Sequence, residues 1–349
     1  MYVRSSSRVT GTHCTSRSGC CASPGACGRA SSAKSLAGFP SRPGRRCGCC
    51  ASPIACGRAS SARCWSRVHA ETRSATFVPG LLDGQVALVT GGGTGLGLAT
   101  ARELAACGAS VLITGRRQEP LERAAGEIGA PCSWATGDVR DPSDAAKVID
   151  TALERHGRLD TLVNNAGGQY FVPAEAIAGK GWQAVMALNV SGTLLMARTA
   201  AERAMRPAGG GMIVNVTLSP HHGLPGMTHS SAARAAVEGL TRALAAEWVP
   251  HRIAVTAAAA GHFETEAIRK YPEQVRRGAA RTVPLQRLGR PEEHAWLIAL
   301  LASPLGRALN GSVVTLDGGR DNWFGPWPPP TLTDETGRSW PLPRRNRAR

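Results

Sequence analysis

Between residues 85 and 320 the chain alternates between two patterns of hydrophobic positions. Short runs of apolar, often β-branched residues predict strands, and longer stretches whose apolar residues recur every three or four positions predict helices. We expect strands at 86–90, 110–114, 132–136, 159–163, 212–217, 253–258 and 312–316. We expect helices at 98–107, 119–128, 143–155, 181–205 and 291–301, with one more across 230–237. Strands that alternate with helices through short loops indicate an α/β fold with a parallel, doubly wound sheet and helices on both faces.

A glycine-rich turn follows the first predicted strand directly. Gly91, Gly95 and Gly97 let the backbone turn sharply and let the next helix approach the strand closely. The first turn of that helix then offers unpaired N–H groups and the positive end of its dipole to a pyrophosphate. The sequence therefore predicts a dinucleotide site at this turn, although an ordinary strand-to-helix turn would give the same pattern.

The residues after the second and third predicted strands bear on which dinucleotide binds. In such sites an acid at the end of the second strand holds the ribose hydroxyls, whereas an arginine there receives a 2′-phosphate. Gly115 stands at that place and is followed by Arg116 and Arg117, which favours NADP(H) over NAD(H). Asp138 follows the third strand, where its carboxylate suits the edge of the adenine. The alternative is a solvated arginine pair without a ligand.

The net charge of +16 is concentrated at the two ends of the chain. Residues 1–70 carry eleven Arg or Lys and no Asp or Glu, and residues 338–349 carry five Arg and no acid, so that 71–337 is neutral. This distribution argues against nucleic-acid binding by the region with the predicted strands and helices. Nine of the eleven cysteines lie in 14–64 at spacings that fit zinc poorly, so we expect no metal site.

Three regions follow from these patterns. We expect a disordered, basic extension rich in Cys, Arg and Ser at 1–75, a folded domain at 80–325 and a tail rich in Pro and Arg at 326–349. The extension resembles an organelle transit peptide in composition, but we favour upstream sequence joined by a misassigned start. It lacks the hydrophobic core of a signal peptide, and no run of eighteen apolar residues occurs. We therefore expect a cytoplasmic protein without a membrane span.

Several short motifs in the folded region resemble the short-chain dehydrogenase/reductase family. They are T-G-x-x-x-G-L-G at 90–97, G-D-V at 137–139, N-N-A-G at 164–167, R-L-G-R-P-E-E at 287–293 and L-D-G-G at 316–319. The resemblance implies a single-domain Rossmann fold with a seven-stranded sheet, a nicotinamide cofactor, and a homotetramer or homodimer. Together with the glycine turn, it assigns cofactor binding to Thr90, Gly91, Thr94, Gly95, Leu96, Gly97, Arg116, Arg117, Asp138, Val139, Asn165, Ala166, Gly167, Arg234, Gly261 and Thr265.

One polar residue lies on an otherwise apolar face of the predicted helix at 181–205. Asn189 shares this face with Val185 and Met186, among others. A buried amide must find hydrogen-bond partners, and the family resemblance implies that this Asn holds a water of the proton relay. A core asparagine satisfied by the protein itself is the alternative.

The sequence departs from the family at the catalytic residues. The family uses a Ser with a Tyr and a Lys spaced Y-x-x-x-K, but aligning the chain on 235–237 puts Ser230 at the Tyr position and Arg234 at the Lys position. The family's Ser falls on Thr217, or on Ser219 if the loop is longer. A serine hydroxyl is a far weaker acid than a tyrosine, and an arginine does not give up its proton. The predicted site thus keeps hydrogen-bond donors and loses the proton shuttle of an alcohol dehydrogenase.

Reduction of a C=C bond conjugated to a thioester is less sensitive to this loss. Negative charge then develops as an enolate, which hydrogen-bond donors stabilise as in an oxyanion hole. The enoyl-CoA and dienoyl-CoA reductase branch of the family lacks the same Tyr, and the chain resembles the peroxisomal trans-2-enoyl-CoA reductases of that branch at 164–169, 179–182 and 229–235. We therefore expect an NADPH-dependent reductase of trans-2-enoyl-CoA thioesters.

The sequence leaves several candidates for the proton donor and for the activity. Tyr170, His221, His222 and His229 are candidates for the missing acid. Our candidate catalytic residues are Asn189, Thr217, Ser219, Ser230, Arg234, His229 and Tyr170. Two other functions fit the same motifs. One is an NADP-dependent dehydrogenase of branched or terpenoid alcohols or aldehydes, and the other is a pseudoenzyme that binds the cofactor but lacks the Tyr and Lys.

Overall fold

The computed structural model describes residues 74–323, apart from 220, 267, 269, 270 and 272. The predicted folded domain at 80–325 falls almost wholly within this range. The predicted extension at 1–75, save its last two residues, and the predicted tail at 326–349 lie outside the described residues.

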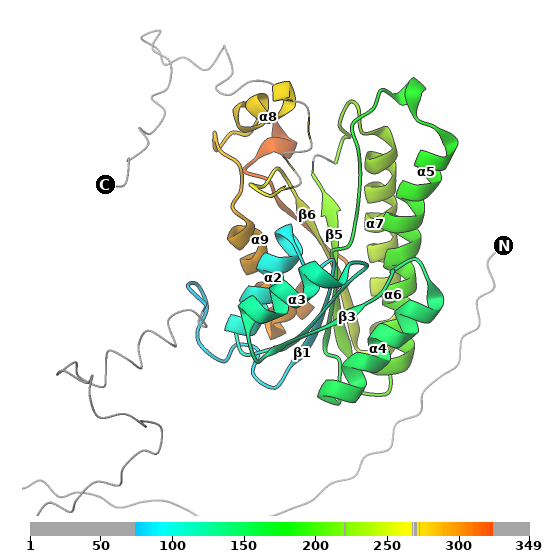
Figure 1. Ribbon diagram of the computed structural model, residues 1–349, viewed down its shortest axis with the longest axis vertical. Coiled ribbons are helices and arrows are strands. Elements are labelled where there is room, and N and C mark those ends of the chain that lie inside the picture. Colours follow the sequence, from blue (N-terminus) through cyan, green and yellow to red (C-terminus); the bar gives the residue numbers. More distant parts are fainter. Residues whose placement is uncertain (1–73, 220, 267, 269–270, 272, 324–349) are drawn as a thin grey trace, which may run out of the picture. The chain divides into compact units, whose positions relative to one another are not determined.

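The described part of the chain contains one parallel sheet with helices on both faces (Figure 1). Its strands are β1 Val86–Thr90, β2 Ser110–Gly115, β3 Cys132–Thr136, β4 Thr161–Asn164, β5 Gly211–Leu218, β6 Ile253–Ala260 and β7 Val313–Leu316. They are ordered β3-β2-β1-β4-β5-β6-β7, which confirms the prediction of a doubly wound, seven-stranded sheet. The strand order reverses between β1 and β4, and at such a switch point the flanking loops diverge and leave a crevice at the carboxyl ends of the strands.

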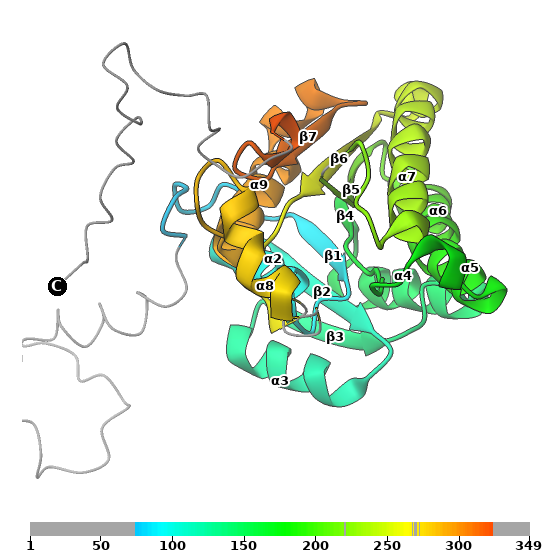
Figure 2. The ribbon, with the colours of Figure 1, turned by 90° about the horizontal axis from the view of Figure 1, so that it is seen from above.

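The helices cover the sheet in two layers, as Figures 1 and 2 show. One face carries α2 Gly95–Ala106, α3 Gln118–Ile128 and α9 Pro291–Ala302. The other face carries α4 Pro142–His156, α6 Gly192–Ala200 and α7 Thr228–Glu247. Two shorter helices, α5 Gly179–Met186 and α8 Glu273–Ala279, precede α6 and α9 along the chain.

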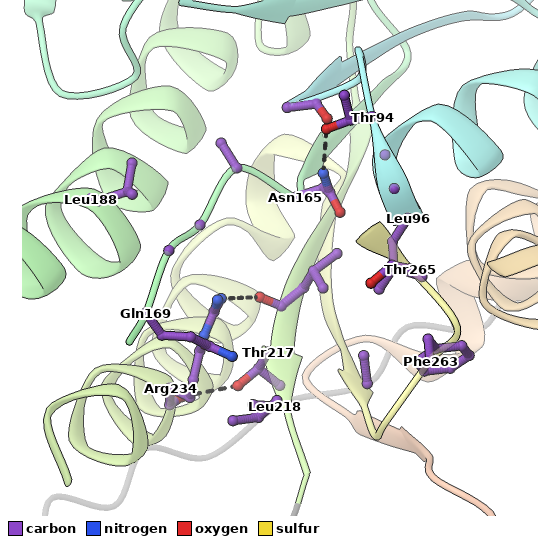
Figure 3. A pocket seen from close by; sticks show the side chains of 18 of the residues that line it. Thr94, Leu96, Asn165, Gln169, Leu188, Thr217, Leu218, Arg234, Phe263 and Thr265 are labelled. Carbon is purple, nitrogen blue, oxygen red and sulfur yellow. Dashed lines mark hydrogen bonds between the residues drawn. The ribbon is translucent and has the colours of Figure 1, made fainter. Parts of the chain in front are cut away.

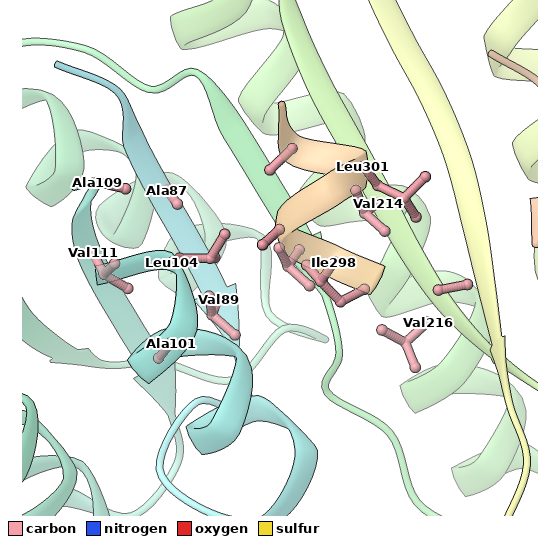
Figure 4. Close-up of a cluster of buried hydrophobic side chains, with 14 of the residues drawn as sticks. Ala87, Val89, Ala101, Leu104, Ala109, Val111, Val214, Val216, Ile298 and Leu301 are labelled. Carbon is pink, nitrogen blue, oxygen red and sulfur yellow. The ribbon is translucent and has the colours of Figure 1, made fainter. Parts of the chain in front are cut away.

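Alternate residues of the central strands supply the two hydrophobic cores. In β1, Ala87 and Val89 pack in the core beneath α2 and α9, whereas Leu88 packs in the core on the opposite face. Because parallel strands covered on both faces bury nearly every side chain, they consist of unbroken apolar runs, which made them recognisable in the sequence. Figure 4 shows the first core, with Leu104 contributed by α2 and Ile298 by α9.

The predicted helix at 181–205 is continuous but irregular. It consists of α5, a π turn at Ala187–Ser191, α6 and a second π turn at Ala201–Met205. By length and composition alone the segment Gly179–Met205 could cross a membrane, a candidate that the search for unbroken apolar runs did not find. Half of its most apolar window is buried inside the fold, where Met196 packs in the core with α4 and α7. The segment is thus buried as a core helix is. Because polar residues are interspersed among its apolar ones, it contains no unbroken apolar run.

Candidate active site

A cavity of about 910 Å³ lies at the carboxyl ends of the strands. Its walls come from the segments that follow β1 to β6, so it lies at the crevice expected from the strand order. Its volume is that of a site for a large organic ligand, since such pockets measure about 300–1,000 Å³. Figure 3 shows several of its side chains, among them Gln169, Thr217 and Arg234, which come from the loop after β4, from β5 and from α7.

The glycine turn after β1 has the geometry of an anion-binding turn. Gly91 and Gly95 have φ angles of +67° and +56°, in the left-handed region that favours glycine. A Cβ at Gly97 would collide with the carbonyl oxygen of Gly91 and lie 2.5 Å from Nδ2 of Asn165, so only glycine allows α2 to begin this close to β1. A Cβ at Gly95 would have only the Thr265 side chain within 4 Å. The first turn of α2 therefore opens onto the cavity, where its N–H groups can receive a pyrophosphate.

Thr90 does not line the cavity, unlike the other residues to which the sequence assigns cofactor binding. It is almost fully buried, and its Oγ1 accepts hydrogen bonds from the backbone N–H groups of Asn165 (3.0 Å) and Ala166 (2.9 Å). In return, Nδ2 of Asn165 donates to the carbonyl oxygen of Thr90 at 2.9 Å. Thr90 therefore joins the loop after β4 to the turn after β1 by hydrogen bonds, and it lies behind the residues that line the cavity.

Two exposed arginines and one carboxylate lie where the adenosine end of a dinucleotide is expected. Arg116, Arg117 and Asp138 all line the cavity. Arg140 holds Asp138 through Nε (2.9 Å) and Nη2 (2.5 Å), and this pair, with a smaller effect of Arg116, lowers the pKa of Asp138 to about 2. Because Arg140 is the main partner of this carboxylate, Asp138 does not neutralise the positive charge at the end of β2.

Asn189 lies behind the cavity wall, in the first π turn of the long helical segment. It is fully buried, and its Nδ2 donates to the carbonyl oxygens of Gly168 (2.9 Å) and Val185 (2.8 Å). Its Oδ1 accepts from the backbone N–H of Gly168 at 3.2 Å. All polar atoms of this amide therefore have protein partners, and its contact with the cavity is indirect, through the backbone of the loop after β4.

Ser230, at the position of the family's tyrosine, is shut off from the cavity. Its hydroxyl is fully buried and donates to Oε1 of Gln169 at 3.0 Å. Nε2 of Gln169 in turn donates to the hydroxyl oxygen of Tyr271 at 2.8 Å. Gln169 and Tyr271 both line the cavity, and neither was among the residues singled out from the sequence.

Arg234, at the position of the family's lysine, lines the cavity. Its Nη1 donates to the carbonyl oxygen of Val216 at 2.9 Å, and its Nε, shielded from solvent, has no hydrogen-bond partner among the described residues. A Cβ on Gly167 would lie 2.6 Å from Nη2, so this glycine leaves the room that the guanidinium occupies. Desolvation lowers the pKa of Arg234 to about 10, and Tyr271 acts in the opposite direction.

Two hydroxyls on β5 and its following loop also face the cavity but have partners already. Thr217 donates to the backbone oxygen of Arg234 at 3.2 Å, with Oε1 of Glu238 at 3.5 Å as a weaker acceptor. Ser219 donates to the carboxylate of Asp317 after β7. Either hydroxyl can turn to a ligand only by giving up one of these bonds.

Of the four predicted candidates for the missing acid, Tyr170 is the one that lines the cavity. Its hydroxyl lies against Gly181 at the start of α5, where a Cβ would collide with it. His229 is buried against the Tyr170 ring, 4.4 Å between centroids, and neither of its ring nitrogens has a partner among the described residues. His221 contacts Glu238 at 2.7 Å and His222 lies 3.3 Å from Asp321, both outside the lining.

His262, after β6, also lines the cavity, and no motif in the sequence singled it out. Burial, reinforced by the charge of Arg320, lowers the pKa of His262 to about 4. Nη1 of Arg320 lies 2.6 Å from Nδ1 of this ring. The imidazole is therefore neutral at pH 7 and cannot serve there as an acid. Gly261 and Thr265, for which the family resemblance predicts cofactor contacts, line the cavity on the same segment.

The family model described as enoyl-(acyl carrier protein) reductase matches residues 91–321, which span the whole cavity. The chain belongs to the short-chain dehydrogenase/reductase family. It is 37% identical over 255 residues to a probable 2,4-dienoyl-CoA reductase of Bacillus subtilis, covering 71% of this chain and 100% of the relative. It is 36% identical over 251 residues to a peroxisomal 2,4-dienoyl-CoA reductase of Pongo abelii, covering 70% and 86%.

A solved structure is similar as well. The citronellol catabolism dehydrogenase of Pseudomonas aeruginosa superposes with a TM-score of 0.64 at 39% identity, covering 70% of this chain and 98% of that one. These short-chain dehydrogenase/reductase relatives confirm that the chain is an oxidoreductase close to the dienoyl-CoA reductase branch. The family works with nicotinamide cofactors, and the glycine turn with its open first helical turn fits the pyrophosphate of such a group.

Proposed function

We propose that this oxidoreductase uses NADPH to reduce the C=C bond of trans-2-enoyl-CoA thioesters. One observation carries the proposal: Arg234, which is charged at neutral pH, faces the cavity at the family's lysine position, while Ser230 is closed off at the tyrosine position. The reaction centre therefore has a fixed positive charge and lacks an acid at the family's usual place. The dienoyl-CoA reductase names of two relatives support the same class of substrate.

A fixed positive charge suits an intermediate that gathers negative charge on oxygen. Addition of hydride to the β-carbon of an enoyl thioester moves the π electrons toward the thioester oxygen and gives an enolate, which a preorganised cation stabilises. Reduction of a ketone gives an alkoxide instead, which is much more basic and needs an acid beside the same oxygen. The buried hydroxyl of Ser230 cannot be that acid, because it is weakly acidic and already donates to Gln169.

Residues along the whole cavity would hold the dinucleotide. The first turn of α2 would bind the pyrophosphate, Arg116 and Arg117 the 2′-phosphate, and the segment with Gly261 and Thr265 the nicotinamide end. When bound, NADPH supplies the hydride. We infer NADPH rather than NADH because the end of β2 carries two guanidinium groups, while Arg140 engages the carboxylate of Asp138.

The test follows NADPH absorbance with the purified full-length protein and trans-2-enoyl-CoA, and separately with 2,4-dienoyl-CoA. Oxidation that requires the thioester supports the proposal. Arg234→Met keeps much of the side-chain volume without the charge, and kcat should fall by about 100-fold or more because the enolate loses its cation. Saturable NADPH binding without turnover of either thioester would contradict the proposal and favour the cofactor-binding pseudoenzyme.

A dehydrogenase of branched or terpenoid alcohols is the second candidate. It is favoured by the similar structure from Pseudomonas aeruginosa, whose name is citronellol catabolism dehydrogenase. Reduction of NADP⁺ with citronellol, together with inert enoyl-CoA thioesters, would select this function over the first.

The assembly and the location of the protein stay predictions. The family resemblance predicts a homotetramer or homodimer, and the sequence predicts a cytoplasmic location. Light scattering on the purified full-length chain tests the first prediction, and fractionation of cells that produce it tests the second.

A further inference from the structure

Tyr271 places a phenol in the cavity, where the family's tyrosine is missing. It lies in the segment between β6 and α8 and lines the cavity. Its ring packs edge-on against Phe171, with 4.9 Å between centroids and 74° between planes. Its hydroxyl lies 2.8 Å from Nε2 of Gln169, a residue 102 positions away in the sequence. Two neighbours in the loop after β4 thus position the phenol, one through its ring and one through its oxygen.

The hydrogen bond to Gln169 leaves the phenolic proton available. Nε2 of Gln169 is the donor and the Tyr271 oxygen is the acceptor, while Oε1 of the same amide accepts from Ser230 at 3.0 Å. Ser230 therefore orients the amide so that its N–H₂ group faces the phenol. Since the O–H bond of Tyr271 is not used for Gln169, it can point to a ligand in the cavity, and the amide remains to stabilise the oxygen after the proton has left.

Arg234 adds a positive charge to the same group of side chains. The effect of Tyr271 on Arg234 favours the charged guanidinium. The guanidinium and the phenol therefore lie close enough to interact electrostatically. Its Nε has no partner among the described residues. Ser230 thus acts on Tyr271 through Gln169, and Arg234 acts on it through its charge, although neither is itself an acid.

We propose that Tyr271 is the general acid of the reductase, and this inference rests on the proposed function. Hydride from NADPH forms a C–H bond at the β-carbon of the enoyl thioester, and the π electrons move to the α-carbon and the thioester oxygen. The O–H bond of Tyr271 breaks as its proton forms a C–H bond at the α-carbon, and the oxygen keeps the electron pair as a tyrosinate. The thioester gains the two electrons that NADPH loses, and water returns a proton to the tyrosinate. Gln169 acts as a positioning residue in this scheme.

The other candidate acids are less well placed. The hydroxyl of Tyr170 lies against Gly181 on α5, and His229 is buried outside the lining. His262 faces the cavity but is neutral, as its pKa of about 4 requires. Glu266 also lines the cavity, but it is exposed, and no contact among the described residues positions its carboxylate as Gln169 positions Tyr271.

The test compares the full-length protein with Tyr271→Phe, which keeps the ring and its contact with Phe171 and removes only the hydroxyl. With trans-2-enoyl-CoA and NADPH, kcat should fall by about 100-fold or more, the usual contribution of a general acid. Affinity for NADPH, measured by fluorescence, and the melting temperature should stay unchanged.

Each other outcome has a defined meaning. An active wild type with an equally active Tyr271→Phe overturns this inference and leaves the proposed function intact. A loss that appears in Tyr170→Phe, with Tyr271→Phe active, moves the role to Tyr170. A wild type that oxidises no NADPH with any enoyl or dienoyl thioester refutes the proposed function, and this inference with it.

Discussion

His294 on α9 should make the folded protein sensitive to acid. The ring is fully buried, packs edge-on against Phe263 at 5.7 Å between centroids, and has no hydrogen-bond partner for either nitrogen among the described residues. Burial lowers the pKa of His294 from 6.5 to about 4. Between these two values the unfolded chain binds a proton that the folded protein does not, so the stability is complete above pH 6.5 and is lost as the pH falls toward 4.

The expected size of the effect follows from the two pKa values. At 1.36 kcal/mol per pKa unit, this one ring should cost about 2 kcal/mol of the free energy of unfolding between pH 8 and pH 5, and about 3 kcal/mol by pH 4. His294→Leu replaces the titrating ring with an apolar side chain of similar size. At pH 8 the variant should be as stable as the wild type or more stable, because two unsatisfied nitrogens leave the core.

The assay is urea unfolding of both full-length proteins at pH 8, 6.5 and 5, with the free energy taken by linear extrapolation. The difference between wild type and His294→Leu should grow by about 2 kcal/mol from pH 8 to pH 5. His251→Gln is the matched control, since His251 is exposed, and it should keep the wild-type pH dependence. Parallel loss of stability in the wild type and His294→Leu would refute the reasoning, because the ring would then be protonated equally in both states.

Two further substitutions test the dinucleotide site. Arg116→Ala should raise the Kd of NADPH about 10- to 100-fold, because it removes a charge-assisted hydrogen bond. In the same fluorescence titrations the Kd of NADH should stay nearly unchanged. Equal losses of affinity for both cofactors would refute a role of Arg116 in binding the 2′-phosphate. Gly97→Ala should abolish NADPH binding and lower the stability by about 1–3 kcal/mol, since its Cβ would collide with the Gly91 carbonyl. Its control is Gly126→Ala on α3, where a Cβ would meet nothing within 4 Å; that variant should gain about 0.5–1 kcal/mol in thermal unfolding.

The fold could be predicted because its signals are local. Each strand of a parallel sheet covered on both faces is an apolar run of its own, as Val86–Thr90 shows, and the glycines of the first turn follow directly in the sequence. The direction of a side chain is a different matter. Thr90 stands within the glycine motif, but its contacts with Asn165 and Ala166 turn it away from the cavity.

The partners within the candidate site could not be predicted, because they are distant in the sequence. The hydrogen bond between Gln169 and Tyr271 spans 102 residues, and no periodicity or spacing reports it. One signal was available: with few tyrosines in the chain and none at the family's position, each remaining tyrosine merited attention. His262 and His294 are similar cases, since the low pKa of each arises from burial that only the packed fold creates.

Because Arg234 lies in the cavity, the stability of the folded protein should depend on whether a ligand is bound there. Desolvation disfavours the charge of its guanidinium, and its Nε has no hydrogen-bond partner among the described residues, so a ligand that offers this group an acceptor would lower the cost of keeping the charge in the folded protein. A compound that binds the folded state alone stabilises it by mass action. Thermal-shift screening of unlabelled acyl thioesters should therefore rank them by their affinity for the folded protein, before any turnover is measured.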